Sequence, residues 1–260
     1  MASELSRIDW SAPWFQSWRG VGEPLSGRAV QGVPLYQACN ESLLSRQYPK
    51  GQVRCPVQFA MQSALPEGQA YEHFIHEMHS VPTREGLHDF FNALCWMHFP
   101  LAKKQLNHIQ ASAIKAQGVG SVRGSVRDAA TVFDENASLI QLPDVLWDAL
   151  QLRHWHTAFV THRVLWQDVN VQIFGHAALE KLVNPYKAIT VHLWRVPLGL
   201  PLSEWDAWLA QDLQVDKLAQ KPFLPTPVLG IPAWWAANES PDFYLDDQVF
   251  RPLRASAPTA

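Results

Sequence analysis

The sequence predicts an α+β protein, in which helices pack on a mixed sheet of short strands and an irregular, aromatic C-terminal arm covers part of the body. Segments with a helical spacing of apolar residues are interrupted by short segments in which apolar residues alternate or run together, as they do in strands. The last part of the chain is rich in proline and aromatic residues, and proline limits regular structure there.

A single globular domain is expected over residues 1–253. Its parts are an irregular N-terminal layer (1–65), a core (66–220) and the C-terminal arm (221–253), and a flexible tail (254–260) follows. Hydrophobic residues make up 47% of the 260 residues and charged residues 17%, with 12 Trp and 12 Phe. This composition is typical of a folded protein with an aromatic core.

Charge and cysteine usage narrow the class of protein. The net charge is −3 and no run of Lys or Arg is present, so nucleic acid is not an expected partner. No apolar stretch in the aromatic region is long enough to span a bilayer and no secretory signal precedes the first helix, which favours a cytoplasmic protein without membrane contact. Three widely spaced cysteines indicate neither a disulfide framework nor a zinc site. The oligomeric state stays open.

In the N-terminal layer, glycines and prolines are expected to keep the elements short. Helical turns are predicted in SAPWFQSW and YQACNESLLSRQ, and a strand in CPVQFAM. The core that follows is predicted to begin with a longer helix over 68–80.

The strongest helical signal follows at 82–117. Its first half has apolar residues at the spacing i, i+3, i+4, i+7 and i+8, which is the buried stripe of a core helix: Leu87, Phe90, Phe91, Leu94 and Cys95. Thr83 is the expected N-cap, and Pro100 is expected to begin a second helix that runs to about Gln117.

Strands and helices alternate after a glycine-rich loop at 118–124. Two strands, Thr131 to Phe133 and Ser138 to Leu142, are predicted to form a hairpin across the polar residues 134–137. A helix after Pro143, a strand over 169–174, a helix from His176, a strand over 188–196 and a helix over 202–213 follow. We expect the strands around Val132, Leu139, Ile173 and Val191 to share one sheet.

His88, Asp89 and Asn92 lie on one turn of the central helix and form the first candidate site. A histidine beside a carboxylate can act as a general base or hold a metal ion, so His88 and Asp89 are predicted to be catalytic and Asn92 to bind substrate. The alternative is that these side chains hold neighbouring backbone in place.

His176 and Glu180 form a second candidate site, because His176 begins a helix directly after Gly175. The partial positive charge of a helix N-terminus disfavours the imidazolium, so we expect a neutral His176 with a lowered pKa that serves as a catalytic base. Glu180 is predicted to bind substrate. The alternative is a surface pair between side chains four residues apart.

Arg127, Asp134 and Glu135 bracket the first predicted hairpin strand. An arginine can clamp a phosphate or carboxylate, and Asp134 and Glu135 are candidate ligands of a divalent metal ion. Turn chemistry, through side chain to backbone hydrogen bonds, explains Asp134 equally well. No nucleotide-cofactor motif is present, so a divalent ion is the cofactor to consider.

Four segments in this order resemble a known family: VPTREGLHDFFNALCWMHFP, RDAATVFDEN, FGHAALEKL and GIPAWW. They are similar to the bacterial family catalogued as domain of unknown function 3025, over roughly residues 71–252. The resemblance implies a cytosolic, single-domain bacterial protein of a family with no assigned activity. Members usually carry a pair such as Asn-Trp directly before the His-Asp dipeptide; this chain has Gly86 and Leu87 there, while His88 and Asp89 match.

Two functions follow as hypotheses. The first is a hydrolase or group-transfer enzyme that acts on a small polar or anionic substrate, with His88 or His176 as general base. The second is a non-catalytic ligand-binding or scaffold protein whose polar groups are structural. The enzyme hypothesis requires His88, Arg127, Asp134 and His176 to converge in one cleft.

Overall fold

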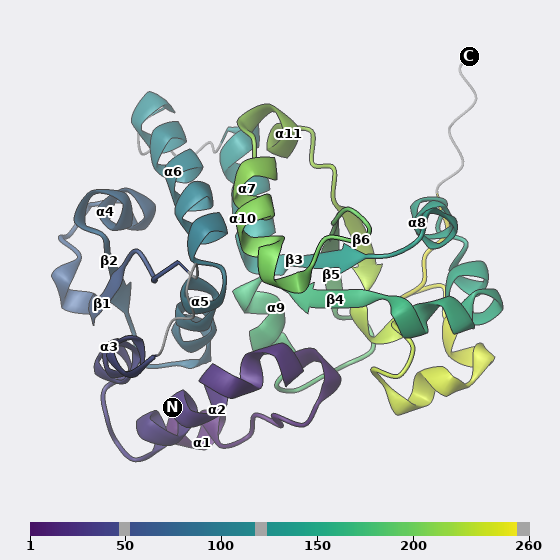
Figure 1. Cartoon of the computed structure of the whole chain (residues 1–260), viewed down its shortest axis with the longest axis horizontal. Coiled ribbons are helices and arrows are strands. Elements are labelled where there is room, and N and C mark those ends of the chain that lie inside the picture. Colours follow the sequence, from purple (N-terminus) through teal and green to yellow (C-terminus); the bar gives the residue numbers. More distant parts are fainter. Residues whose placement is uncertain (47–52, 118–123, 254–260) are drawn as a thin grey trace.

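Helices surround two small sheets in the computed structural model of the protein, which describes residues 1–46, 53–117 and 124–253 (Figure 1). The predicted α+β class is therefore confirmed. The glycine-rich loop, apart from Gly124, and the tail fall outside the described residues.

The main sheet has four strands in the order β4 (Asn170–Ile173), β3 (Ala137–Gln141), β5 (Thr190–Arg195) and β6 (Leu224–Pro227). β3 and β5 are parallel, with Ala137 opposite His192, and β4 and β6 pair antiparallel at the edges. Every residue of β3 is buried. β6 contains two prolines, which an edge strand tolerates because one side of its backbone needs no ladder partner.

The second sheet pairs β1 (Gln58–Met61) with β2 (Ser80–Thr83) in parallel, with Gln58 opposite Ser80. The strand predicted in CPVQFAM is therefore confirmed. Thr83 was predicted as a helix N-cap, which is wrong, because it ends β2 and its hydroxyl donates to the carbonyl of Val81. Helix α5 begins only at Leu87.

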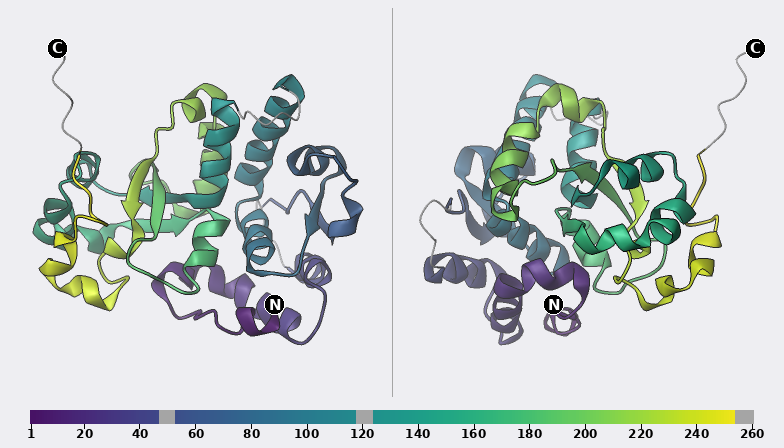
Figure 2. Two further views of the ribbon diagram at one scale, coloured as in Figure 1. Left: turned by 180° about the vertical axis from the view of Figure 1, so that it is seen from behind. Right: turned by 45° about the vertical axis from the view of Figure 1, so that its right-hand side comes forward.

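The N-terminal layer is helical as far as Ser45, where an irregular layer with short helical turns was predicted. It consists of α1 (Ala2–Leu5), a 3₁₀ turn (Pro13–Phe15), α2 (Gln16–Val30) and α3 (Leu35–Ser45), and these helices lie below α5 in Figure 1 and on the same side of the molecule in Figure 2. α2 continues through Pro24 and three glycines because its buried face packs on α5. A Cβ on Gly22 would lie 2.2 Å from the Trp10 ring, so this glycine is a packing residue and not a turn signal.

Three helices form the centre: α4 (Tyr71–Met78), α5 (Leu87–His98) and α6 (Pro100–Gln117). All three confirm predicted helices, and Pro100 begins α6 as expected. The chain is buried without a break from Asp89 to Met97, because α5 packs against α2, α3, α6 and α9.

The predicted hairpin is wrong in its first half. Residues 125–136 form one helix, α7 (Ser125–Asn136), so that Thr131, Val132 and Phe133 are helical and only β3 remains of the two strands. The buried residues of α7 recur with helical spacing and pack against α6, α9 and β5 (Ala129, Ala130, Phe133 and Asp134). This tertiary burial outweighs the strand preference of the β-branched residues.

The remaining helices are α8 (Asp144–Gln151), α9 (His176–Lys181), α10 (Trp205–Asp212) and α11 (Val215–Ala219). The first three were predicted. A π-helical turn (Thr157–Thr161) and a 3₁₀ turn (Arg163–Asp168) join α8 to β4, and further 3₁₀ turns lie at 62–64 and 202–204. None of the helices in the described part of the chain has the length and apolar character needed to cross a bilayer.

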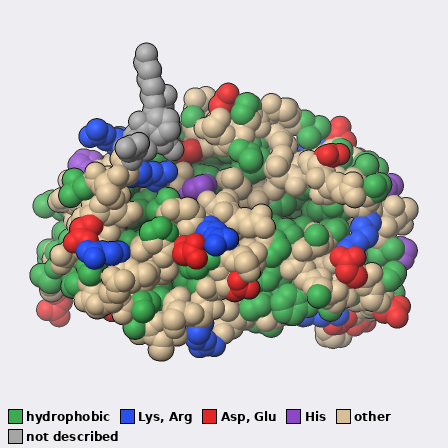
Figure 3. Space-filling model, turned by 60° about the horizontal axis from the view of Figure 1, so that its bottom comes forward, with side chains coloured by type: hydrophobic (Ala, Val, Ile, Leu, Met, Phe, Trp, Pro, Cys, Tyr) green, Lys and Arg blue, Asp and Glu red, His purple; other side chains and the backbone are tan. Residues whose placement is uncertain are grey.

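The C-terminal arm is more regular than predicted. It supplies β6 and then three 3₁₀ turns at Val228–Gly230, Ala236–Glu239 and Pro241–Leu245. Tyr244 stacks on Phe159 at 5.2 Å between ring centroids, and Phe250 lies across both rings. Acidic and basic side chains are interspersed on the face drawn in Figure 3, without a patch of one sign.

Gly175 joins the fold to the candidate site. Its N–H donates to the carbonyl of Ala137 at 2.8 Å, so the turn from β4 into α9 touches the turn from α7 into β3. A Cβ on Gly175 would lie 2.4 Å from the backbone of Glu135 and of Asn136. Only glycine allows this approach, which brings His176 beside the last turn of α7.

Candidate active site

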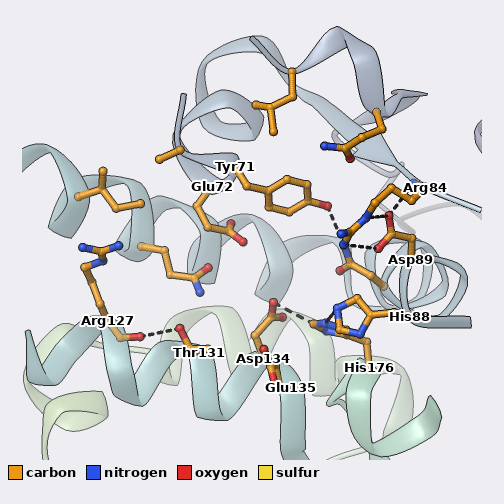
Figure 4. A pocket seen from close by; sticks show the side chains of 16 residues that line it. Tyr71, Glu72, Arg84, His88, Asp89, Arg127, Thr131, Asp134, Glu135 and His176 are labelled. Carbon is orange, nitrogen blue, oxygen red and sulfur yellow. Dashed lines mark hydrogen bonds and ion pairs between the residues drawn. The ribbon is translucent and has the colours of Figure 1, made fainter. Parts of the chain in front are cut away.

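A polar pocket of about 440 Å³ lies among α4, α5, α6, α7 and the start of α9 (Figure 4). His88, Arg127, Asp134 and His176 all line it, which is the convergence that the enzyme hypothesis requires. The full lining is Gln62, Leu65, Ala70, Tyr71, Glu72, Arg84, His88, Asp89, Asn92, Gln110, Ile114, Arg127, Thr131, Asp134, Glu135 and His176.

Helical periodicity explains why these side chains face one space. On α7, Arg127, Thr131 and Asp134 are spaced at i, i+4 and i+7 and therefore share a face. On α6, Gln110 and Ile114 line the pocket four residues apart.

The two predicted catalytic histidines contact each other. Their Nε2 atoms are 3.1 Å apart and the rings are nearly perpendicular, with centroids 4.5 Å apart. Nδ1 of His88 lies 3.0 Å from Oε2 of Glu180, and Nδ1 of His176 lies 3.8 Å from Oδ2 of Asp134. The side chains of Glu180 and His88 are 38% and 41% exposed, whereas those of His176 and Asp134 are 6% and 11% exposed. A chain of four titratable groups thus leads from the surface into the protein.

His176 is neutral at pH 7. Its pKa is lowered from 6.5 to about 4, mainly by burial; Asp134 opposes this shift, and the charges of Lys103 and His88 add to it. The predicted direction is confirmed. The cause is mainly desolvation and not the helix N-terminus, since α9 has only six residues.

Burial of neutral His176 should make stability depend on pH. Between pH 6.5 and about 4 the unfolded chain binds a proton at this residue and the folded protein does not, so stability falls as pH falls through this window and the added loss stops growing below about 4. Urea unfolding at pH 7 and pH 5 should show a larger loss for the native protein than for His176→Gln. Equal losses in the two proteins would contradict the assignment, because other titrating groups such as His98 are common to both.

Lys103 is a buried cation behind the pocket. Its Nζ donates to Oδ1 of Asp134 at 2.5 Å and to Oδ1 of Asn92 at 3.0 Å. Burial alone lowers the pKa of Lys103, but Asp134 and other nearby anions outweigh it and leave the pKa raised. Burial likewise raises the pKa of Asp134, but Lys103 outweighs burial and leaves it lowered. Both groups are therefore charged at pH 7.

Asn92 connects Lys103 to Tyr71 through hydrogen bonds. Its Nδ2 donates to the phenolic oxygen of Tyr71 at 3.1 Å. Burial, with the charges of neighbouring carboxylates, raises the pKa of Tyr71 well above 10, so the phenol stays protonated. Because its oxygen is occupied as an acceptor from Asn92, the O–H remains a donor for a ligand in the pocket.

The carboxylates of Asp89 and Glu180 each bond another side chain of the protein. The carboxylate of Asp89 accepts from the backbone N–H of Arg84 at 2.6 Å and from its guanidinium at 3.2 Å, so it fixes the connection between β2 and α5. The carboxylate that holds His88 is that of Glu180, which does not line the pocket. Glu180 is therefore placed to orient His88.

Arg127 lines the pocket on the first turn of α7. Its Nη1 is buried and has no hydrogen-bond partner within the described parts of the chain. Glu72 lies between Arg127 and the histidines in Figure 4, and burial, with Asp134 adding to it, raises its pKa to about 7. A guanidinium with a buried, unused donor suits an anionic ligand.

The predicted metal ligands, Asp134 and Glu135, both line the pocket. However, Asp134 is paired with Lys103, and no group of three or more His, Cys, Asp or Glu side chains in the described ranges is arranged to hold a metal ion. The metal prediction gains no support from this arrangement.

Several residues of the site were missed from the sequence. Five of them line the pocket, namely Tyr71, Glu72, Arg84, Gln110 and Thr131, and Lys103 lies behind it. One signal was present. Lys103, Asn107 and Gln110 recur at i, i+4 and i+7 beside the apolar stripe of α6. A polar stripe of this kind is usually a solvated face, and only the packing of α4 and α7 over it makes it part of a site.

Comparison with known proteins identifies the family of this chain. A family model described as "Protein of unknown function (DUF3025)" matches residues 57–254, which is most of the chain and includes every pocket residue. No curated protein and no solved structure matches the chain.

Proposed function

The chain belongs to the DUF3025 family, and since this membership assigns no chemistry, we propose from the pocket that the protein is a hydrolase or group-transfer enzyme that acts on a small polar or anionic substrate. His176 is the general base, and His88 takes the proton onward. The observation that carries the proposal is the chain of Glu180, His88, His176 and Asp134.

The proton count of this chain supports a base at His176. When both imidazoles are neutral they carry two N–H groups. One is placed between Glu180 and His88 and the other between His88 and His176, which leaves a lone pair on Nδ1 of His176 beside Asp134. That nitrogen is buried and has no hydrogen-bond partner in the residues described. A third proton there would remove the unfavourable contact between a lone pair and a carboxylate.

In the proposed reaction, His176 accepts the proton and His88 holds the resulting positive charge. Nδ1 of His176 is buried beside Asp134, so a hydroxyl or water would reach it once the carboxylate of Asp134 moves aside. The hydroxyl or water would then lose its proton to Nδ1 of His176 while its oxygen bonds to the substrate, and the Nε2 proton of His176 would move to His88. The extra charge rests on His88, because the carboxylate of Glu180 lies 3.0 Å from its Nδ1 and accepts a hydrogen bond from it. The bond between the substrate and its leaving group would break next, and the proton held on His88 would return through His176 to the leaving group. Tyr71 supplies a hydrogen bond to the oxygen that gains negative charge.

The second hypothesis, a non-catalytic ligand-binding protein, has its own support. Lys103 with Asp134 and Arg84 with Asp89 are satisfied ion pairs that stabilise the walls of the pocket. These pairs do not explain the contact between His88 and His176, and turnover separates the two functions.

A cytosolic, bacterial setting belongs to the same proposal. Cys39, Cys55 and Cys95 are all free, and burial raises the pKa of each thiol, which suits a reducing compartment.

The test is a panel of chromogenic phosphate, sulfate and carboxylate-bearing esters, assayed for turnover. For any compound turned over, His88→Gln and His176→Gln should each lower kcat/KM by at least about 100-fold, which is the usual contribution of general acid–base catalysis. The matched control is His154→Gln, since His154 is exposed and outside the pocket. Turnover that survives both pocket substitutions would contradict the proposed base. Binding without turnover would favour the second hypothesis.

A further inference from the structure

The pocket has two chemically different ends. Arg127 lies on the first turn of α7 and Asp134 on its last turn, seven residues later. Seven residues of α-helix span about 10 Å and return to the same face. Figure 4 shows the same separation, with Arg127 at one end of the pocket and His88 and His176 at the other.

The Arg127 end is built for an anion. The buried Nη1 of Arg127 lacks an acceptor among the described residues, and a buried donor without a partner is destabilising unless a ligand supplies one. The planar guanidinium matches the oxygens of a carboxylate or phosphate. Its place on the first turn also puts a bound anion near the positive end of the α7 dipole.

Polar groups line the space between the ends. Thr131 donates its hydroxyl to the backbone carbonyl of Arg127, which leaves its oxygen free to accept. Glu72 and Gln110 line the same space and offer further donors and acceptors. A ligand that crosses it therefore meets hydrogen-bonding groups along its length.

We propose that the substrate is an elongated molecule whose terminal phosphate or carboxylate binds Arg127, while its reacting group lies at the opposite end of the pocket, at His88 and His176. This inference rests on the proposed function and narrows its substrate class. A short anion fills one end only, whereas a molecule of matching length engages both.

The test compares probes of different length by isothermal titration calorimetry. They are inorganic phosphate, 2-hydroxyethyl phosphate, 6-hydroxyhexyl phosphate, 7-hydroxyheptanoate and uncharged 1,6-hexanediol. The six-carbon phosphate or the heptanoate should bind at least about tenfold more tightly than the short phosphates and the diol, because it contacts both ends. The tighter of the two long probes identifies the terminal group.

Substitutions at the two ends of the pocket test which residues contact the probes. Arg127→Gln should weaken the long anionic probe by about tenfold or more, and Arg127→Lys by less, because lysine keeps the charge and loses the planar fork. Arg19→Gln removes an exposed arginine of α2 and should change nothing. His88→Gln should reduce the advantage of the long probe over the short one. Circular dichroism checks that each variant is folded.

Two results would overturn the inference: equal affinity for short and long probes, or undiminished binding of the long probes by folded Arg127→Gln. The results that would contradict the proposed function differ from those that would contradict the elongated substrate. Length-dependent binding with no turnover in the ester panel would leave the elongated ligand in place and remove the catalytic base. Turnover that depends on His88, without any preference for length, would remove only the elongated substrate.

Discussion

Replacing Lys103 with methionine is expected to lower the free energy of unfolding by about 3–5 kcal/mol, measured by urea denaturation. Lys103 is 3% exposed, and its ammonium bonds both Asp134 and Asn92. Methionine fills much of the same volume but leaves the carboxylate of Asp134 charged and uncompensated inside the protein. Such a group costs far more than the pair itself contributes.

Two further variants show whether the lower free energy of unfolding of Lys103→Met comes from the unpaired carboxylate of Asp134. Lys104→Met makes the same change at an exposed neighbour and should stay within about 0.5 kcal/mol of the native protein. The double variant Lys103→Met with Asp134→Leu removes both charges and should recover a large part of the loss. A cost for Lys103→Met no greater than for Lys104→Met would show that the buried pair does not form.

Phe91→Ala is expected to cost about 3–5 kcal/mol, because it leaves a cavity that the neighbours can only partly fill. Phe91 is fully buried on α5 and stacks on Phe15 with centroids 5.6 Å apart, and Phe90 meets its edge at 5.3 Å. It therefore joins α5 to the N-terminal layer as well as filling the core.

Chemical denaturation measures this loss, and Leu44→Ala is the control, since Leu44 is 87% exposed and its truncation leaves no cavity. A loss below about 1 kcal/mol for Phe91→Ala would mean that the ring does not occupy the centre of the core.

Local patterns were sufficient where one face of an element is buried. The stripe of Phe90, Phe91 and Leu94 predicts α5 because buried residues on a helix must recur with its period. Local sequence patterns were insufficient at α2 and α7. Pro24 predicts a break and Thr131 to Phe133 a strand, yet burial against α5, α6 and α9 outweighs both preferences.

The sequence by itself determined the α+β class, the central helices, three of the four strands of the main sheet, and His88, Arg127, Asp134 and His176 as the side chains to consider. Tertiary structure alone decided their partners. Glu180 holds His88 across 92 positions of the chain and Lys103 neutralises Asp134 across 31, and no local spacing records such contacts. The physical reason is that periodicity reports which face of an element is buried, whereas a site depends on which faces meet. Here the approach of Gly175 to Asn136 sets that meeting and places two histidines and two carboxylates in one chain.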